Sequence, residues 1–383
     1  ISDDNIVFSH TSILEFYLAE YARNNEEFLN FMIQKGNRIH FKNEICFYSG
    51  LVPDCKKLLD GMADTIIEAI MKNIGIVDTL NNIEIITDFK IEKDELIKTL
   101  EENRPTQKEI DDMSNNSQKE ITPDEFSKKK SPVLLENKQN LQDSESIKEK
   151  VAQEEAEDFY LLVSIYGSIL KNAELLDNSY KVQHLENYMY AMNILLGEIF
   201  ALSENIKKEI SFEDYIEENQ EEGENLTQED FEKSKELFLE MIKVSFPIAL
   251  QHVILENVGT PKLEVAIDEL MEQKKYKPFE KFMLEFLKCD LNVGNVIPEL
   301  HRYIQKETSE GIIKLIIMKL LFYYRMRIFG TNKQIYNGIL DLIIEAQIKL
   351  NMNKDLTKVL KGNKSLVRKE LAKQIENNPN INL

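Results

Sequence analysis

The sequence is poor in cysteine, with three in a chain of 383 residues. Cys46, Cys55 and Cys289 are an odd number, and they form no CxxC pair or other close cluster of metal ligands. We therefore expect no metal site, and a reduced, cytoplasmic environment suits such a chain best. Cys46 and Cys55 are expected to be small core residues.

The sequence also lacks an uncharged apolar stretch of about eighteen or more residues, the length that a membrane-spanning helix needs. Its N-terminus has no basic segment followed by an apolar one, so no signal peptide is predicted. The chain begins at Ile1 rather than at a methionine and soon enters patterned sequence. We accordingly expect a piece of a longer protein that has no membrane as a partner.

Basic residues are scarce relative to acidic ones: 47 Lys and Arg stand against 67 Asp and Glu, which gives a formal net charge of -20. Such a field repels phosphate backbones and anionic lipid headgroups, so nucleic acid is not an expected partner. Carboxylate pairs at helical spacing arise everywhere by chance in so acidic a chain, and none of them indicates general acid–base catalysis. The expected partner is a protein ligand.

Apolar residues recur at helical spacing over most of the chain, which predicts an all-α fold. Shifts in composition divide the chain into residues 1–100, an acidic flexible linker over 101–158, and a helical interaction domain over 159–383. A second acidic stretch, 213–232, is predicted to be an exposed loop. Helices of this length joined by brief polar turns form a helical array that resembles an α-solenoid in scale. The helices expected after the linker are 159–176 and 182–202, as an antiparallel pair, then 260–272, 278–287, 298–306, 312–329 and 334–350.

Residues 312–324 are apolar nearly all round and are predicted to form a central buried helix. A single apolar stripe along 334–350 should pack against this helix. The basic residues here form a cluster with two tyrosines, and snorkelling at the end of a buried helix is favoured over a site for a phosphate or an acidic partner. The cluster consists of Lys314, Lys319, Arg325, Arg327, Lys333, Tyr323 and Tyr324.

A short motif with specific content lies at the start of the chain. Residues 6–8, Ile-Val-Phe, are typical of a short strand, and His10 follows on the turn. Ser12 and Glu15 have the spacing of a capping box that starts a helix. A histidine between a strand and a capped helix lies at the helix N-terminus, where backbone N–H groups and the helix dipole favour an anion. The helix that follows is rich in aromatic residues, namely Phe16, Tyr17 and Tyr21.

The segment FSHTSILEFYLA, residues 8–19, resembles the end of the winged-helix domain of NACHT-type STAND NTPases, a family of nucleotide-switched innate-immune and bacterial antiviral receptors. The segment EICFYSGL, residues 44–51, is similar to a phrase that follows the winged helix there, ahead of a C-terminal sensor. The resemblance covers residues 5–60. It implies that His10 contacts the β-phosphate of bound ADP and helps to hold a closed, inactive state. It also implies ADP or ATP as cofactors of the intact parent protein, and oligomerisation of the parent on activation.

The sequence departs from a whole receptor of that family in one decisive way. It contains no GxxxxGK[ST] phosphate loop and no apolar strand that ends in paired acidic residues for a magnesium ion. The chain alone is therefore predicted to be no enzyme and to hold no cofactor, with the nucleotide-hydrolysing half upstream of Ile1. Its expected role is that of a sensor and regulatory region that recognises a protein ligand and controls the nucleotide-dependent switch. The alternative is a free-standing helical scaffold that binds a peptide or protein without a nucleotide.

The other four histidines are expected to have structural or surface roles. They lie on different predicted helices, and no two of them have the spacing of metal ligands. These residues are His40, His184, His252 and His301.

The role implied for His10 can be tested in the intact parent protein. His10→Ala should remove a charge-assisted hydrogen bond of about 1.5–3 kcal/mol that exists mainly in the closed state. We expect weaker ADP binding and an open-to-closed ratio raised by on the order of ten- to a hundredfold, with activity in the absence of ligand. The measurements are ADP affinity, melting temperature and ligand-independent activity. Unchanged ADP affinity with a lowered melting temperature in the nucleotide-free protein would make His10 a core residue instead.

Overall fold

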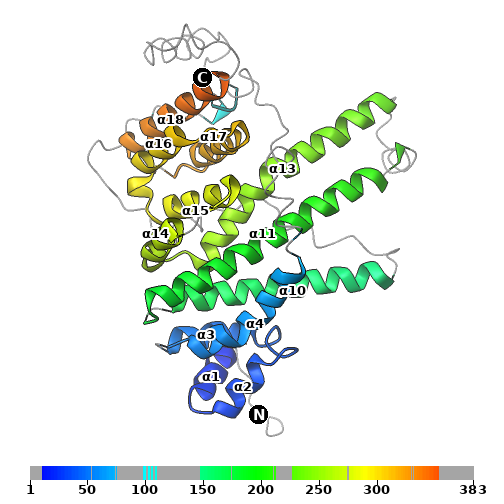
Figure 1. Cartoon of the computed structure of the whole chain (residues 1–383), viewed down its shortest axis with the longest axis vertical. Helices are drawn as coiled ribbons and strands as arrows, with labels where there is room; N and C mark the ends of the chain where they lie inside the picture. Colours follow the sequence, from blue (N-terminus) through cyan, green and yellow to red (C-terminus); the bar gives the residue numbers. More distant parts are fainter. Residues whose placement is uncertain are drawn as a thin grey trace. The chain divides into compact units, whose positions relative to one another are not determined.

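A computed structural model of the chain confirms the all-α prediction (Figure 1). Within the described ranges, twelve α-helices and two 3-10 helices follow one another and no β-strand occurs. The strand predicted at residues 6–8 lies outside those ranges. The structure describes residues 11–73 except 53, residue 75, residues 98–100, 102–103, 105–106 and 108–109, residues 147–209 except 174, residues 211–212 and 227–273, and residues 276–352 except 329 and 331.

Each helix that the apolar spacing predicts beyond residue 158 is present. The short helix η2 and α14 together account for the helix predicted at 260–272. In chain order the helices are α1 (Thr11–Arg23), α2 (Glu26–Ile33), α3 (Lys42–Leu51), α4 (Lys56–Lys72), α10 (Ile147–Asn172), α11 (Asn178–Glu209), α13 (Gln228–Val258), η2 (Pro261–Leu263), α14 (Glu264–Gln273), α15 (Pro278–Leu291), η3 (Val293–Asn295), α16 (Val296–Lys306), α17 (Glu310–Arg325) and α18 (Lys333–Met352).

Two helices extend into segments that were predicted to be non-helical. α10 begins at Ile147, inside the predicted linker, and α13 begins at Gln228, inside the predicted loop. The extension of α10 is rich in Glu, Gln and Lys and that of α13 in Gln and Glu, which favour helices without supplying an apolar stripe. Hydrophobic periodicity therefore could not reveal them. Most of the remaining linker and loop lies outside the described residues.

The chain divides into two units, each assembled from three segments. Unit 1 comprises Ile1–Val77, Ser131–Gly197 and Val253–Lys275, and unit 2 comprises Asp78–Lys130, Glu198–His252 and Tyr276–Leu383. Helices α11 and α13 contribute residues to both units. The division predicted from composition has three consecutive ranges instead, because composition does not show which distant segments pack together.

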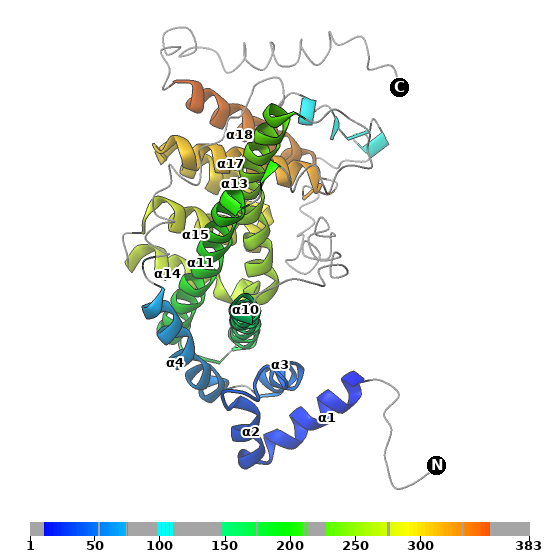
Figure 2. The ribbon, with the colours of Figure 1, turned by 90° about the vertical axis from the view of Figure 1, so that its right-hand side faces the viewer.

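In unit 1, α3 and α4 pack against α10, and α1 packs against α2 and α3 (Figure 2). Asn25 begins α2, because its Oδ1 accepts a hydrogen bond from the backbone N–H of Phe28 at 3.0 Å. At the other end of the unit, Nδ2 of Asn172 on α10 donates to Oγ of Ser49 on α3 at 2.8 Å. The last contact fixes α3 against the long helix α10, and α1 packs on α3 in turn.

Helices α10 and α11 form the predicted antiparallel pair, and Gly167 marks their close approach. A Cβ atom on Gly167 would lie 2.6 Å from Cε2 of Tyr188 and 3.0 Å from Cβ of Asn257. The Tyr188 ring is fully buried, and its hydroxyl accepts a hydrogen bond from Nδ2 of Asn257 at 3.2 Å. The ring cannot move aside without losing that bond, so only glycine fits at position 167.

In unit 2, α17 is the predicted buried helix, and its apolar residues are almost all covered. It begins at an N-cap, Ser309, whose Oγ accepts from the N–H of Ile312. Helix α18 packs against it, as predicted, and α15 contacts it as well. The apolar stripe of α18 is buried throughout and consists of Ile335, Ile339, Leu342, Ile343, Ala346 and Leu350.

Lys319 corrects the snorkelling interpretation of the basic cluster. Its side chain is 0% exposed, and its Nζ lies 3.0 Å from Oδ2 of Asp290 on α15. The hydroxyl of Tyr323 donates to the other oxygen of the same carboxylate. Nζ also lies 5.9 Å from the ring centroid of Phe286 and 5.0 Å from that of Tyr323. Burial raises the pKa of Asp290, while the ammonium group of Lys319 opposes that shift.

Removal of one partner from this buried pair should destabilise unit 2 strongly. Lys319→Met leaves the Asp290 carboxylate buried without its cation, and we expect a loss of about 3–5 kcal/mol in the free energy of unfolding. The loss should be larger at about pH 8 than at about pH 5, since an uncompensated carboxyl group escapes the cost by taking up a proton.

Urea unfolding measures this loss, and Lys314→Met on the same helix serves as the control. Lys314 makes a longer ion pair with Glu310, at 3.8 Å, across one turn of α17. Its replacement should change stability by less than about 1 kcal/mol. Equal effects of the two substitutions would contradict the role of the buried pair.

Candidate functional site

His10, the residue that the sequence singled out, lies outside the described residues. The structure does show that α1 begins at Thr11, directly after it, and that the first turn of α1 has no acidic residue. The predicted capping box is wrong, because Ser12 lies inside α1 and Glu15 bonds elsewhere. Its Oε1 accepts a hydrogen bond from Nδ2 of Asn43 on α3 at 2.7 Å. Glu15 thus joins two helices instead of capping one.

Helices α1, α2 and α3 expose a set of large apolar side chains that we call the aromatic surface. Tyr17 is 58% exposed and Tyr21 is 55% exposed, whereas Ala19 and Ala22 on the opposite face of α1 are buried. Exposed apolar groups that gather in one place usually mark a binding site. The members of the aromatic surface are Ile13, Leu14, Phe16, Tyr17, Tyr21, Phe31 and Phe47.

Ring contacts make this surface continuous across the three helices. The ring of Phe16 meets those of Tyr17 and Phe47 edge to face, at centroid distances of 5.9 Å and 6.2 Å. One turn further along α1, Tyr21 lies 5.3 Å from Phe28 of α2. Phe28 in turn stacks on Phe31 at 6.3 Å. Such edge-to-face and stacked pairs hold the rings in defined positions.

A pocket of about 420 Å³ opens between α1 and α3 at one end of the aromatic surface, lined by Glu15, Asn43, Cys46 and Phe47. Burial raises the pKa of the Cys46 thiol, so this cysteine is protonated at neutral pH. A protonated thiol is a poor nucleophile and a poor metal ligand. The Cys46 thiol in this pocket is therefore not activated as a nucleophile.

A polar cluster joins α4 to α10 and α11. Nδ1 of His184 is hydrogen bonded to the hydroxyl of Tyr166 at 2.5 Å, and Nε2 lies 3.8 Å from Oδ1 of Asp60. The hydroxyl of Tyr180 donates to the same carboxylate oxygen. The ammonium group of Lys56 lies 5.1 Å from the centre of the Tyr180 ring. The cluster joins three helices of unit 1.

A tyrosine, a histidine and an aspartate that contact one another in that order can suggest a catalytic relay. The burial of Tyr166 and His184 argues for a structural role instead. Tyr166 is fully buried, so no substrate reaches its oxygen. Burial raises the pKa of Tyr166 and lowers the pKa of His184, with the lowering opposed by Asp60 and aided by Lys56. Both groups are held in their neutral forms, which favours a fixed hydrogen bond.

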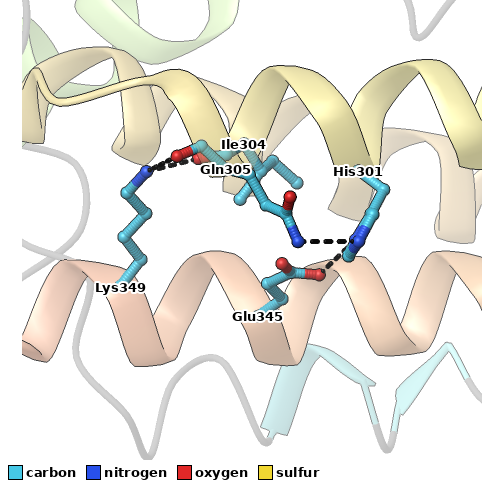
Figure 3. A network of polar contacts seen from close by, with 5 residues as sticks. All are labelled: His301, Ile304, Gln305, Glu345 and Lys349. Carbon is cyan, nitrogen blue, oxygen red and sulfur yellow. Dashed lines mark hydrogen bonds and ion pairs between the residues drawn. The ribbon is translucent and has the colours of Figure 1, made fainter.

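A second histidine network holds α16 against α18 in unit 2 (Figure 3). Nδ1 of His301 lies 2.8 Å from Oε2 of Glu345, and its Nε2 lies 2.8 Å from Nε2 of Gln305. Lys349 reaches across from α18 and donates to the carbonyl oxygens of Ile304 and Gln305 at 2.5 Å and 2.8 Å. These carbonyls belong to the last turn of α16, so Lys349 caps that helix. The network is structural, as predicted for His301.

The remaining predicted candidates do not come together as a site. His40 is exposed on the connection before α3, and His252 is buried in α13. Arg327 donates to the backbone oxygen of Asn103, which leaves the basic–aromatic cluster engaged within unit 2. The described part of the chain contains no group of three or more potential metal ligands. It also contains no helix long and apolar enough to cross a membrane.

Comparison with family models, with curated proteins and with solved structures found no match to this chain. The assignment of a site therefore depends on the geometry alone. The aromatic surface is the candidate that this geometry favours. Its signal in the sequence was the aromatic-rich helix after His10, in which Ile13, Tyr17 and Tyr21 follow at intervals of four residues.

The polar cluster on α4 predicts how the stability of unit 1 depends on pH. Because the pKa of His184 is lowered in the folded state, folding favours the neutral imidazole. The contribution of His184 to the free energy of unfolding should be fully present above about 6.5, the pKa of the imidazole in the unfolded chain. It should be lost as the pH drops below that value. His184→Asn keeps a polar atom near the position of Nδ1 but cannot titrate, so this variant should lose less stability on acidification.

Thermal unfolding at about pH 7.5 and about pH 5.5 measures this difference on either side of the unfolded pKa. His301→Asn is the matched control, because His301 is partly exposed and faces a carboxylate. An identical acid response in the wild-type chain and His184→Asn would show that His184 does not contribute.

Proposed function

We propose that this chain is a non-catalytic helical region that acts by binding a protein ligand. In the fuller form of the proposal it is the sensor and regulatory region of a STAND-type NTPase, in which ligand recognition controls a nucleotide-dependent switch. The aromatic surface on α1, α2 and α3 is the observation that carries the binding function. Aromatic side chains are enriched at protein interfaces, where tyrosine supplies much area at a small cost in side-chain entropy.

The chemistry of the aromatic surface supports a protein rather than a small charged ligand. Glu20 and Arg23 form an ion pair with each other at 3.0 Å, as do Glu26 and Lys57 at 2.7 Å. These charged side chains beside the aromatic residues are therefore paired with one another. Aromatic side chains accompanied by polar groups are the usual composition of a protein-binding site.

The nucleotide part of the proposal depends on the resemblance of residues 8–19 to the winged-helix segment of STAND NTPases. Two features are compatible with it. His10 immediately precedes α1, and the first turn of that helix has no acidic side chain to compete with a phosphate. ADP or ATP would then be a cofactor of the intact parent and not of this chain.

The alternative is a free-standing helical scaffold that binds its partner without a nucleotide. The aromatic surface fits this alternative equally well, since nothing in its geometry requires a phosphate. The receptor proposal and the scaffold alternative differ in what the gene should encode before Ile1. A phosphate-loop module directly upstream supports the receptor, and its absence supports the scaffold.

Site-specific photocrosslinking tests the binding function in cells that make the protein. Benzoylphenylalanine at position 17 should give discrete covalent adducts, because Tyr17 lies at the centre of the aromatic surface. The same probe at position 265 is the control, since Val265 of α14 is 65% exposed but does not belong to the aromatic surface. Tyr21→Ser should weaken the adducts formed at position 17. Equal labelling from the two positions would remove the case for protein binding at this surface.

A further inference from the structure

Helix α1 is apolar on two opposite faces. Ala19 and Ala22 face the interior of unit 1, while Ile13, Tyr17 and Tyr21 follow one another at intervals of four residues along the outer face. Residues four apart lie above one another on a helix, so these three side chains form a straight ridge. Exposed apolar side chains that gather on one face of a helix usually mark a surface that binds a partner. The outer face of α1 therefore has the properties of a surface that is covered in the working protein.

The extent of the aromatic surface is that of a protein interface. Its seven side chains are each between about a third and three-fifths exposed. A large apolar side chain contributes up to about 200 Å² when buried, so each member has between about 75 and 115 Å² to cover and the whole surface has about 600 Å². A standard interface takes about 800 Å² from each partner. The aromatic surface supplies about three-quarters of this area before its polar rim is added.

The charge around the surface narrows the choice of partner. Residues 11–73 contain nine acidic and seven basic side chains, whereas the whole chain has 67 acidic and 47 basic ones. The N-terminal helices are thus nearly neutral within a chain of net charge -20. A basic partner would gain more from the acidic remainder of the chain than from this region. Charge repulsion between two molecules of the chain is weakest, by contrast, when they meet through these nearly neutral helices.

We propose that the aromatic surface binds a second copy of this chain in a two-fold symmetric dimer. The inference rests on the proposed protein-binding function and names the partner at that surface. The ridge on α1 is evenly spaced about Tyr17. Two antiparallel copies of α1 related by a two-fold axis at Tyr17 place the Ile13 and Leu14 end of one helix beside the Tyr21 end of the other. Such an isologous contact needs a self-complementary patch, and this spacing provides one.

Analytical ultracentrifugation of the full chain between about 1 and 100 µM tests the proposal, since this range brackets micromolar affinity. We expect a reversible equilibrium between monomer and dimer. Raising the salt from about 0.1 M to about 1 M shortens the Debye length from about 10 Å to about 3 Å. The dimer should become tighter, because screening weakens repulsion between two acidic chains while the apolar contact persists. A monomer at every concentration and salt level overturns the proposal.

Two variants identify the surface that forms the dimer. Tyr17→Ser with Tyr21→Ser should weaken dimerisation at least about 30-fold, the effect typical of losing central aromatic contacts. Val265→Ser should leave the equilibrium unchanged. All three side chains are exposed, so circular dichroism should show the helical fold intact in both variants. A dimer of unchanged strength in the tyrosine variant also overturns the proposal.

The proposed function and the proposed partner can fail separately. A monomeric chain that crosslinks through position 17 to a different protein retains the binding function and refutes the second copy. A chain that gives no specific adduct at position 17 refutes the binding function itself. A dimer that crosslinks to its own copy through position 17 supports both.

Discussion

Burial of apolar helix faces is the interaction on which both units depend, and they satisfy it to different degrees. In unit 2 the apolar residues of α17 are covered nearly completely, with α15 and α18 against them. In unit 1 the inner face of α1 is buried through Ala19 and Ala22, but its outer face remains in water. Exposed apolar area costs about 25 cal/mol per Å² relative to burial. The exposed face of α1 is therefore a source of free energy that association can still use.

Polar groups inside each unit determine which helices pack together. Apolar contacts are non-directional and allow neighbouring helices to slide, whereas a buried charge or hydroxyl is stable only beside its partner. Asp290 and Lys319 select the pairing of α15 with α17, and His184 with Tyr166 selects that of α10 with α11. The two polar clusters thus give specificity to cores whose stability comes from apolar contacts.

Most helices after residue 158 were predictable because their apolar stripes are local in sequence, whereas α13 was not among the predicted helices. The pairing of Lys319 was not, since its partner Asp290 lies on another helix and no pattern in α17 distinguishes a buried lysine from a snorkelling one. The aromatic surface had a signal in the ridge of Ile13, Tyr17 and Tyr21, but periodicity shows that a face is apolar and not whether it is covered. The acidic starts of α10 and α13 have no stripe, so composition placed them in a linker and a loop.

The contact at Gly167 has a mechanical consequence for unit 1. A ring lies where a Cβ would stand, so rotation of α10 about its axis by one residue would bring a side chain into the position of the Tyr188 ring. Sliding of α10 along α11 would break the hydrogen bond between Tyr166 and His184. The two long helices are therefore interlocked where they meet, and neither can rotate or slide past the other without losing a contact.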